Sequence, residues 1–470
     1  MKVKTSLRAS LVLALVVCAG CTALGANPPD SPLGYASGGS ASSLRAMRSA
    51  AGAKIKHVIV IIQENRSFDE MFQGFPGADT QNYGLNHLGK HVPLLQAPLN
   101  QRFGLPHGHS TFQLEADYDQ SAGHYRMDGF DLVDGCSGKP SCKHSAYTYV
   151  QELDVANYWT YAQQYALGDM TFQPNMGPSW AAHQYLIAGQ TGGYTSTLDA
   201  LDVDPAGHTE CNNPANYPSI DMTTAYPGLP GKPQSSCVTY PTIFDELNTA
   251  GIPWKYYARL RAGFWTAPSS VLSLWNNYQQ NVSFPSTNVL TDIANHAIPP
   301  VVYVTPGDSF SDHPYLNLTN HGQDWLALIA NAIGEDPYYW KNTVIVLTWD
   351  DWGGYFDHVP PPFAINPAGG NPDPNEYGMR VGFIVIGAYV VPHVVDHAAR
   401  SSLAVLPFIE SVFGLPSLGT LDAQQDDLMG LFNFSQTPNK YHHVTTHGWS
   451  GLQAHRDEVR DPSPIDDDMK

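Results

Sequence analysis

The stretch Thr343–Pro362 constrains the fold more than any other part of this chain of 470 residues. It begins with an apolar, β-branched run, which predicts a strand buried on both faces. The run leads into Asp350 and Asp351, and a Gly353–Gly354 turn follows. A buried strand that presents carboxylates at its carboxyl end is a common way for α/β sheets to build a ligand site. A capped strand with a solvated acidic turn is the alternative interpretation.

Strands and helices alternate along the chain. Apolar runs predict further strands at Val58–Ile62, Ile252–Tyr257, Val301–Val304 and Phe383–Ile386. Amphipathic segments predict helices at 155–166, 180–189, 242–251, 322–333 and 403–413. This alternation predicts a three-layer α/β sandwich, with a mostly parallel sheet flanked by helices, over residues 54–440. We expect residues 80–125 and 190–240 to form loops.

The balance of charge restricts the partners. The chain has 24 basic and 43 acidic residues and a formal net charge of -19. Nucleic-acid binding requires a basic face, so this class of partner is not expected. An anionic substrate is compatible with the charge, because a bound cation can reverse the local field.

The N-terminus predicts export from the cytoplasm. Basic residues precede the apolar run Leu11–Val17, so we interpret residues 1–25 as an export signal. The run is too short to span a membrane. Two cleavage interpretations remain open: lipidation at Cys21, which would anchor the protein, or release at the small residues Ala23–Ala26. Either places the protein in the cell envelope, the periplasm or the medium.

The remaining cysteines support an oxidising compartment. Four lie outside the signal, and the local pairs Cys136 with Cys142 and Cys211 with Cys237 are the expected disulfides. Their spacing does not suit a metal site. Residues 26–53 are rich in Gly, Ser and Ala and predict a flexible linker, and residues 441–470 predict a disordered acidic tail.

Polar groups follow two of the predicted strands. Glu64 and Asn65 come after the strand at Val58–Ile62, as Asp350 and Asp351 come after theirs. Carboxylate and amide oxygens suit a hard divalent cation such as Mg, Ca or Mn, and added histidines would admit Zn. Adjacent strand residues point to opposite faces, so both aspartates can face one ion only if the strand breaks there. We expect the double glycine to break it.

Several motifs in order carry a family resemblance. They are Gln63–Asp69, Met127–Phe130, Gly177–Ser179, Pro241–Asp245, Ser311–Pro314 and Trp349–Pro362. Together they resemble the bacterial phosphoesterase family, which includes phospholipases C, their plant non-specific relatives and acid phosphatases. The resemblance covers roughly residues 55–435. It implies a fold similar to the alkaline phosphatase core.

The resemblance also implies the site. One divalent ion (Ca, Mg, Mn or Zn) would be held by Glu64, Asn65, Ser179, Asp350 and Asp351. Ser179 matches the family's nucleophile. Taken alone, it could equally be the N-cap of the following helix.

Three histidines match family positions near the phosphate, as oxyanion partners or leaving-group acids: His109, His313 and His358. After Ser179 the chain departs from the family, with Ala181, Ala182 and His183 where Pro-Asn-Arg is common. This departure leaves the contacts to the substrate undefined.

The implied activity is hydrolysis of a phosphate ester through a phosphoseryl intermediate. Phospholipase C-type cleavage of phosphodiesters is the leading hypothesis, and it allows membrane contact through the substrate or a lipid anchor. An acid-phosphatase-type phosphomonoesterase is the alternative, and a non-catalytic binding protein on the same fold is a third. An open apolar cleft lined by Trp180, Tyr185 and Trp352 would favour phospholipids, and a tight polar pocket would favour monoesters.

Overall fold

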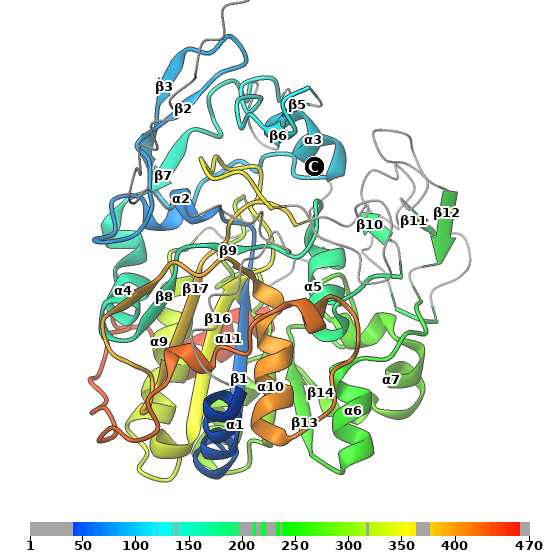
Figure 1. Cartoon of the computed structure of the whole chain (residues 1–470), viewed down its shortest axis with the longest axis vertical. Helices are drawn as coiled ribbons and strands as arrows, with labels where there is room; N and C mark the ends of the chain where they lie inside the picture. Colours follow the sequence, from blue (N-terminus) through cyan, green and yellow to red (C-terminus); the bar gives the residue numbers. More distant parts are fainter. Residues whose placement is uncertain are drawn as a thin grey trace, which may run out of the picture.

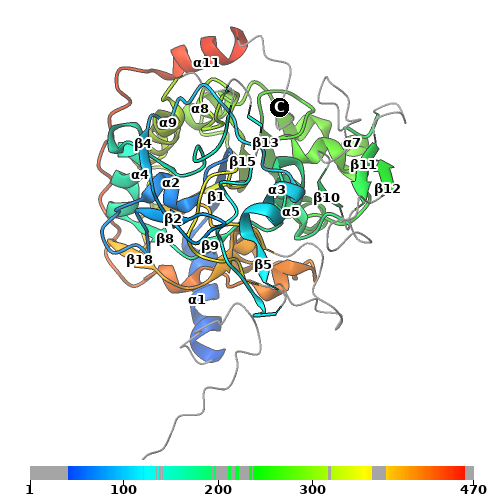
Figure 2. The ribbon, with the colours of Figure 1, turned by 90° about the horizontal axis from the view of Figure 1, so that it is seen from above.

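The computed structural model describes residues 41–460, except 120, 134, 137, 138, 140, 193, 197–209, 213–217, 222–231, 236, 316–318 and 363–376. The predictions for the export signal, for Cys21 and for residues after 460 therefore lie outside the described residues. The described chain forms the predicted three-layer α/β sandwich, with one large sheet between two layers of helices (Figures 1 and 2).

The central sheet has eight strands in the order β14-β13-β15-β1-β16-β17-β8-β18. In chain order they are β1 (His57–Gln63), β8 (Ala166–Gly168), β13 (Trp254–Tyr257), β14 (Val282–Ser283), β15 (Val301–Val304), β16 (Thr343–Trp349), β17 (Phe383–Gly387) and β18 (Val394–Asp396). Only β17 is antiparallel to its neighbours β16 and β8. The sheet is therefore mostly parallel, as predicted.

The two strands predicted to carry the site lie side by side in the middle of the sheet. β1 and β16 are parallel, and their register pairs Gln63 with Trp349. Their apolar residues are buried on both faces, as the continuous apolar runs predicted. Because the two strands end at the same level, Glu64 and Asn65 emerge beside Asp350 and Asp351.

Helices cover both faces of the sheet (Figure 2). On one side, α4 and α8 pack against α9; on the other, α10 packs between α1 and α5, and α6 packs against α5. Their bounds are α1 (Ala41–Lys54), α4 (Glu152–Gln164), α5 (Ser179–Ala188), α6 (Ile243–Ala250), α8 (Asn288–Ala294), α9 (Gly322–Gly334) and α10 (Val405–Phe413). Among the described residues, we find no helix with the length and apolar character needed to cross a membrane.

Residues 83–150 form a cap over the carboxyl end of the sheet (Figure 1). The cap contains β2 (Tyr83–Leu85), β3 (His91–Pro93), β4 (Leu95–Ala97), α3 (His109–Ala116), β5 (Tyr118–Asp119), β6 (His124–Tyr125) and β7 (Thr148–Val150). Its apolar side chains form a second core around Trp352, which directly follows the Asp350–Asp351 pair, and Phe356. The prediction of loops over 80–125 missed α3 and the short strands β2 to β6, and the prediction of loops over 190–240 missed β10 (Tyr194–Ser196), β11 (Pro218–Asp221) and β12 (Lys232–Ser235).

Two predictions of flexible segments are wrong for the residues described. Residues 41–54 form α1, which packs against α10. Residues 441–460 also pack on the domain: Trp449 stacks on His321, and α11 (Gly451–Arg460) places the Glu458 carboxylate on the backbone N–H groups of Ser286 and Thr287. Residues 41–54 bury Ala51, and residues 441–460 bury Val444, Trp449 and Ala454.

Both expected disulfides are present, Cys136 with Cys142 in the cap and Cys211 with Cys237 near α7 (Leu272–Asn277).

Candidate active site

The ends of β1 and β16 are tied together by hydrogen bonds. The Asn65 N–H donates to Oδ1 of Asp350 over 2.9 Å, and the Asp350 N–H donates to the Gln63 carbonyl over 3.0 Å. The Arg66 N–H donates to the Asp351 carbonyl over 2.9 Å. Glu64, Asn65, Asp350 and Asp351 are all fully buried. The two strand ends thus form one rigid unit.

Ser179 reaches this unit from a different element. It is the first residue of α5, and Pro178 is the N-cap, so the N-cap interpretation of Ser179 is wrong. Its Oγ lies 3.4 Å from Oε2 of Glu64, 3.4 Å from Oδ1 of Asn65 and 3.3 Å from Oδ2 of Asp351. The structure therefore brings the predicted nucleophile to three of the predicted ligands.

The chain turns sharply after β16, and the turn places both aspartates in the cluster. β16 ends at Trp349, so the break comes before Asp350 rather than at the glycines. Gly353 and Gly354 have positive φ angles of 63° and 77°. A Cβ on Gly353 would lie 2.1 Å from the Asn65 carbonyl oxygen. The first glycine is thus needed for close approach of this turn to the end of β1.

Two histidines that the sequence analysis did not select contact the cluster. Nε2 of His183 lies 3.0 Å from Oε1 of Glu64. Nδ1 of His107 lies 2.7 Å from the Leu105 carbonyl, and its Nε2 lies 2.8 Å from Nδ2 of Asn65. Because a carbonyl only accepts and an amide nitrogen only donates, Nδ1 of His107 carries the hydrogen and Nε2 accepts. This bond turns the Asn65 amide so that its oxygen faces Ser179.

Comparison with known proteins identifies the family of this chain. The model of the Phosphoesterase family matches residues 55–416. The chain belongs to the Phosphoesterase family. Phospholipase C B of Mycobacterium tuberculosis (strain CDC 1551 / Oshkosh) is 23% identical over 440 residues, covering 82% of this chain and 79% of that protein. Non-specific phospholipase C3 of Arabidopsis thaliana is 23% identical over 410 residues, covering 80% of this chain and 74% of that protein.

Other proteins match this chain over a smaller share of their own length or at lower sequence identity. Non-hemolytic phospholipase C of Pseudomonas aeruginosa is 23% identical over 440 residues, covering 82% of this chain but only 58% of that protein. The lipoteichoic acid synthase LtaP of Listeria monocytogenes is 10% identical, with a TM-score of 0.34 over 83% of this chain and 81% of that structure. A likeness at that level carries no argument about function.

The side chains around Ser179 in this chain fit a bound cation. Glu64, Asp350 and Asp351 bring three carboxylates into one buried cluster, which is costly without a positive charge. Oδ2 of Asp350 is buried and accepts no hydrogen bond within the described part of the chain. Ligand atoms of Glu64, His183 and Asp350 lie within 4.8 Å of one another. Most donors are hard oxygens, with one imidazole nearby, so the donor set alone does not select one divalent ion.

The predicted His109 contacts the segment before Ser179, and the predicted His313 lies beside His107, which contacts Asn65. Nδ1 of His109 lies 2.8 Å from the carbonyl of Met176, in the turn that leads to Ser179. The ring of His313 lies 6.3 Å from that of His107, centroid to centroid, and its Nδ1 is 2.6 Å from the Pro314 carbonyl. Both histidines are therefore close to the site, and their catalytic roles stay predictions.

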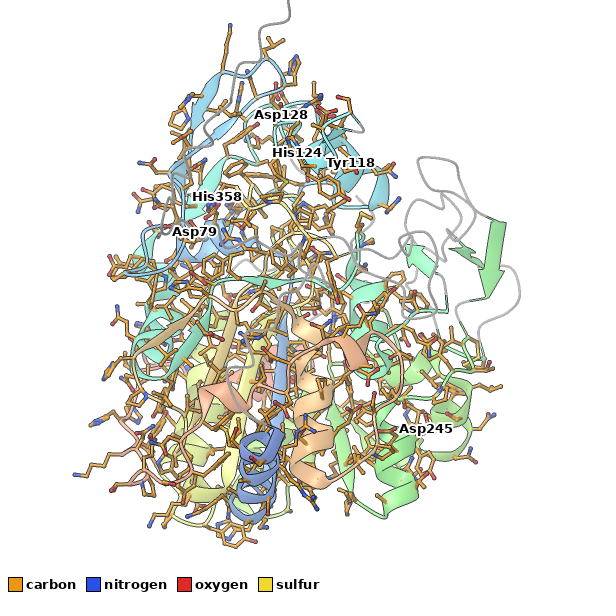
Figure 3. The ribbon with its side chains drawn as sticks, viewed as in Figure 1. Asp79, Tyr118, His124, Asp128, Asp245 and His358 are labelled. Atoms are coloured by element: carbon orange, nitrogen blue, oxygen red, sulfur yellow. A yellow bond between two sulfur atoms is a disulfide. The ribbon has the colours of Figure 1, made fainter. Side chains whose placement is uncertain are left out.

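His358 belongs to a separate group of charges, with Asp79 beside it (Figure 3). Its Nδ1 lies 2.6 Å from Oδ2 of Asp69. Burial acts to lower the pKa of His358, but the hydrogen bond and charge of Asp69 outweigh it and raise the pKa. Asp69, Asp357 and His358 could geometrically hold a metal ion, yet Arg380 already pairs with both aspartates, 3.3 Å from Asp69 and 2.8 Å from Asp357. We therefore interpret this group as a buried ion-pair network.

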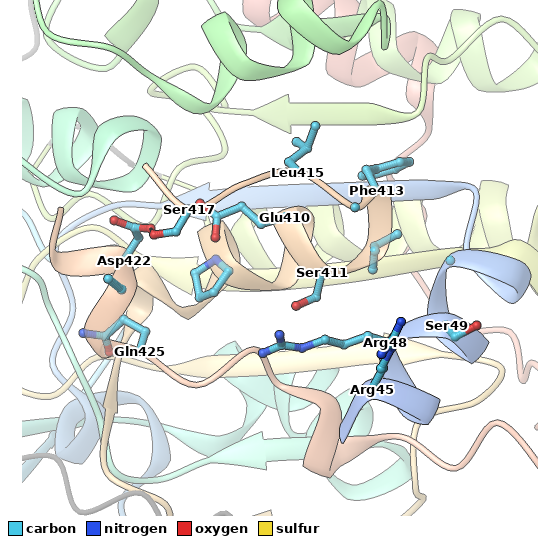
Figure 4. A pocket seen from close by; sticks show the side chains of 15 residues that line it. Arg45, Arg48, Ser49, Glu410, Ser411, Phe413, Leu415, Ser417, Asp422 and Gln425 are labelled. Carbon is cyan, nitrogen blue, oxygen red and sulfur yellow. The ribbon is translucent and has the colours of Figure 1, made fainter. Parts of the chain in front are cut away.

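A cavity of about 730 Å³ lies between α1 and α10, apart from the cluster around Ser179 (Figure 4). Arg45 and Arg48 line it from α1, Glu410 from α10, and Asp422 from the segment after α10. It shares no lining residue with the cluster around Ser179. The cavity is therefore not part of the candidate active site.

Proposed function

We propose that this chain hydrolyses phosphodiesters outside the cytoplasm, in a phospholipase C-type reaction with Ser179 as the nucleophile. The observation that carries the proposal is the position of the Ser179 hydroxyl, 3.3–3.4 Å from side-chain oxygens of Glu64, Asn65 and Asp351. Membership of the Phosphoesterase family and its similarity to proteins called phospholipases C support the reaction class. The two disulfides and the predicted export signal support the compartment.

In the proposed reaction, Ser179 Oγ attacks phosphorus, the bond from phosphorus to the leaving oxygen breaks, and a phosphoseryl enzyme forms. Water then attacks the same phosphorus and releases Ser179 with the phosphate product. A divalent cation held by Glu64, Asn65, Ser179, Asp350 and Asp351 would lower the pKa of the serine hydroxyl and offset the phosphate charge.

His313 and His109 would supply protons or hydrogen bonds to the substrate oxygens, in the roles that the family resemblance implies. Nδ1 of His313 lies 2.6 Å from the Pro314 carbonyl, so Nδ1 carries the hydrogen and the ring is held in one orientation. Burial raises the pKa of the adjacent Asp312 to about 6, against hydrogen bonds from Tyr158 and Trp349 that act to lower it.

A phosphomonoesterase is the second candidate, and one observation favours it. Trp180, Tyr185 and Trp352 are fully buried in the two hydrophobic cores, so these three residues do not form the open apolar cleft that would favour phospholipids. Ser179 itself is fully buried among polar groups. A tight polar site of this kind suits a small phosphate group.

Assays on p-nitrophenyl phosphate and p-nitrophenylphosphorylcholine separate the two candidates. Faster cleavage of the choline diester supports the phospholipase C proposal, and preference for the monoester supports the phosphatase. Cleavage of neither, with a divalent cation present, would reject both and leave a binding protein.

A further inference from the structure

His183 occupies a position that no part of the proposed reaction uses. It is fully buried on α5, four residues after Ser179, so both side chains lie on one face of the helix. Its Nε2 lies 3.0 Å from Oε1 of Glu64 and 3.8 Å from Oδ2 of Asp350. A buried imidazole aimed at two carboxylates has a defined partner and is not a general packing residue.

The two oxygens of Glu64 are divided between two residues of the same helix. Oε2 lies 3.4 Å from Ser179 Oγ, and Oε1 faces His183. A carboxylate only accepts hydrogen bonds, so Nε2 of His183 carries the hydrogen in this contact. We propose that His183 is a positioning residue: its Nε2–H holds Oε1 of Glu64, so that Oε2 is presented to Ser179 and to the bound cation.

This inference rests on the proposed function, because it takes Glu64 as a metal ligand. Outer partners that hold ligating side chains commonly affect metal affinity about 10–100-fold when they are removed. The alternative is that His183 itself binds the cation. The 3.0 Å separation from Glu64 is a hydrogen-bond distance, and Ser179 meets the other oxygen of that carboxylate, so the structure favours the donor role.

The test measures binding of Mn²⁺ to the full chain by electron paramagnetic resonance, with three substitutions compared. His183→Leu removes the donor at similar size, and His183→Gln keeps an N–H donor at similar reach. Gln184→Leu is the matched control. Gln184 is the next residue of α5, is equally buried, and donates to the Ala267 carbonyl over 3.0 Å, away from Glu64.

We expect His183→Leu to weaken Mn²⁺ binding about 10–100-fold. His183→Gln should stay within a few-fold of the wild type, and Gln184→Leu should leave the affinity unchanged. Electron spin-echo measurements detect imidazole nitrogen bound directly to Mn²⁺. We expect no such nitrogen signal to be lost between the wild type and His183→Gln. If His183→Leu does not fold, His183→Asn takes its place, because its shorter amide does not reach Glu64.

Two outcomes would overturn the inference while leaving the proposed function intact. Equal Mn²⁺ affinity in the leucine variants at 183 and 184 would mean that His183 only fills space. Loss of a bound-nitrogen signal in His183→Gln would make His183 a metal ligand. A wild-type chain that binds none of Mn²⁺, Mg²⁺, Zn²⁺ and Ca²⁺ would instead refute the metal-dependent function, and the positioning role with it.

Discussion

Gly353→Ala tests how the turn after β16 supports the site. Gly353 has a φ angle of 63°, and an L-residue in that conformation costs roughly 1–2 kcal/mol. The added methyl would also lie 2.1 Å from the Asn65 carbonyl oxygen, about 0.9 Å short of the 3.0 Å that such contacts keep. Asn65 therefore has to move by about 1 Å. A displacement of that size at a catalytic site costs on the order of 10²-fold in rate.

Gly251→Ala is the control that separates the cost of the positive φ angle from the cost of the close contact with Asn65. Gly251 has a similar φ angle of 68°, but a Cβ there meets no atom within 4 Å. We expect urea unfolding to show a loss of about 1–2 kcal/mol for Gly251→Ala, with kcat/KM unchanged. Gly353→Ala should lose more stability, and kcat/KM on a p-nitrophenyl phosphate ester should fall roughly 10²-fold. If the two variants have equal kcat/KM and equal metal affinity, the proposed role of the turn is wrong.

The remaining predictions address the nucleophile, the cation, the substrate and the cavity. Ser179→Ala should lower turnover by at least about 10³-fold while metal content, measured by elemental analysis, stays intact; near-normal turnover would reject the nucleophile. Dialysis against a chelator should abolish activity and lower Tm, with recovery on adding a divalent ion, and activity that survives complete metal removal would exclude metal dependence. Because Ser179 is enclosed, kcat/KM on phosphatidylcholines should vary little with acyl-chain length; a steep dependence would point to an apolar cleft. Burial, followed by the charge of Asp422, raises the pKa of Glu410 from 4.5 to about 8. The stability that the proton on Glu410 contributes is complete below pH 4.5 and is lost as pH rises to about 8. Between pH 4.5 and about 8, Tm of Glu410→Gln should therefore fall less than Tm of the wild type.

The sequence predicted the framework of the site because that framework depends on local patterns. Continuous apolar runs identified β1 and β16, and the polar residues after them were assigned to a site that the structure assembles. The order of the strands, which sets those two ends side by side, is a long-range property that periodicity does not encode. The reversal of β17 was missed for the same reason.

The histidines show where pattern alone was insufficient. His107 and His109 are two residues apart, and only the fold shows that His107 contacts Asn65 while His109 contacts the carbonyl of Met176. His183 had a usable signal, since four residues separate it from Ser179 on a predicted helix. His183 stands where the family commonly has another residue, and the family pattern therefore does not reveal this helical spacing.

The proposed nucleophile and the other proposed ligands come from different layers of the fold, and this division determines which contacts must stay rigid. Glu64 and Asp351 are fixed by the hydrogen bonds that join β1 to β16, whereas Ser179 is fixed by the packing of α5 on α10 and α6. The sheet also contacts this helix further along, where the Tyr303 hydroxyl of β15 donates to the Leu186 carbonyl of α5 over 3.1 Å. The contact between Glu64 and His183 joins the two layers at the site, because one carboxylate meets both residues of the helix. This contact therefore fixes the position of α5 relative to the sheet at the residues that the proposed chemistry uses.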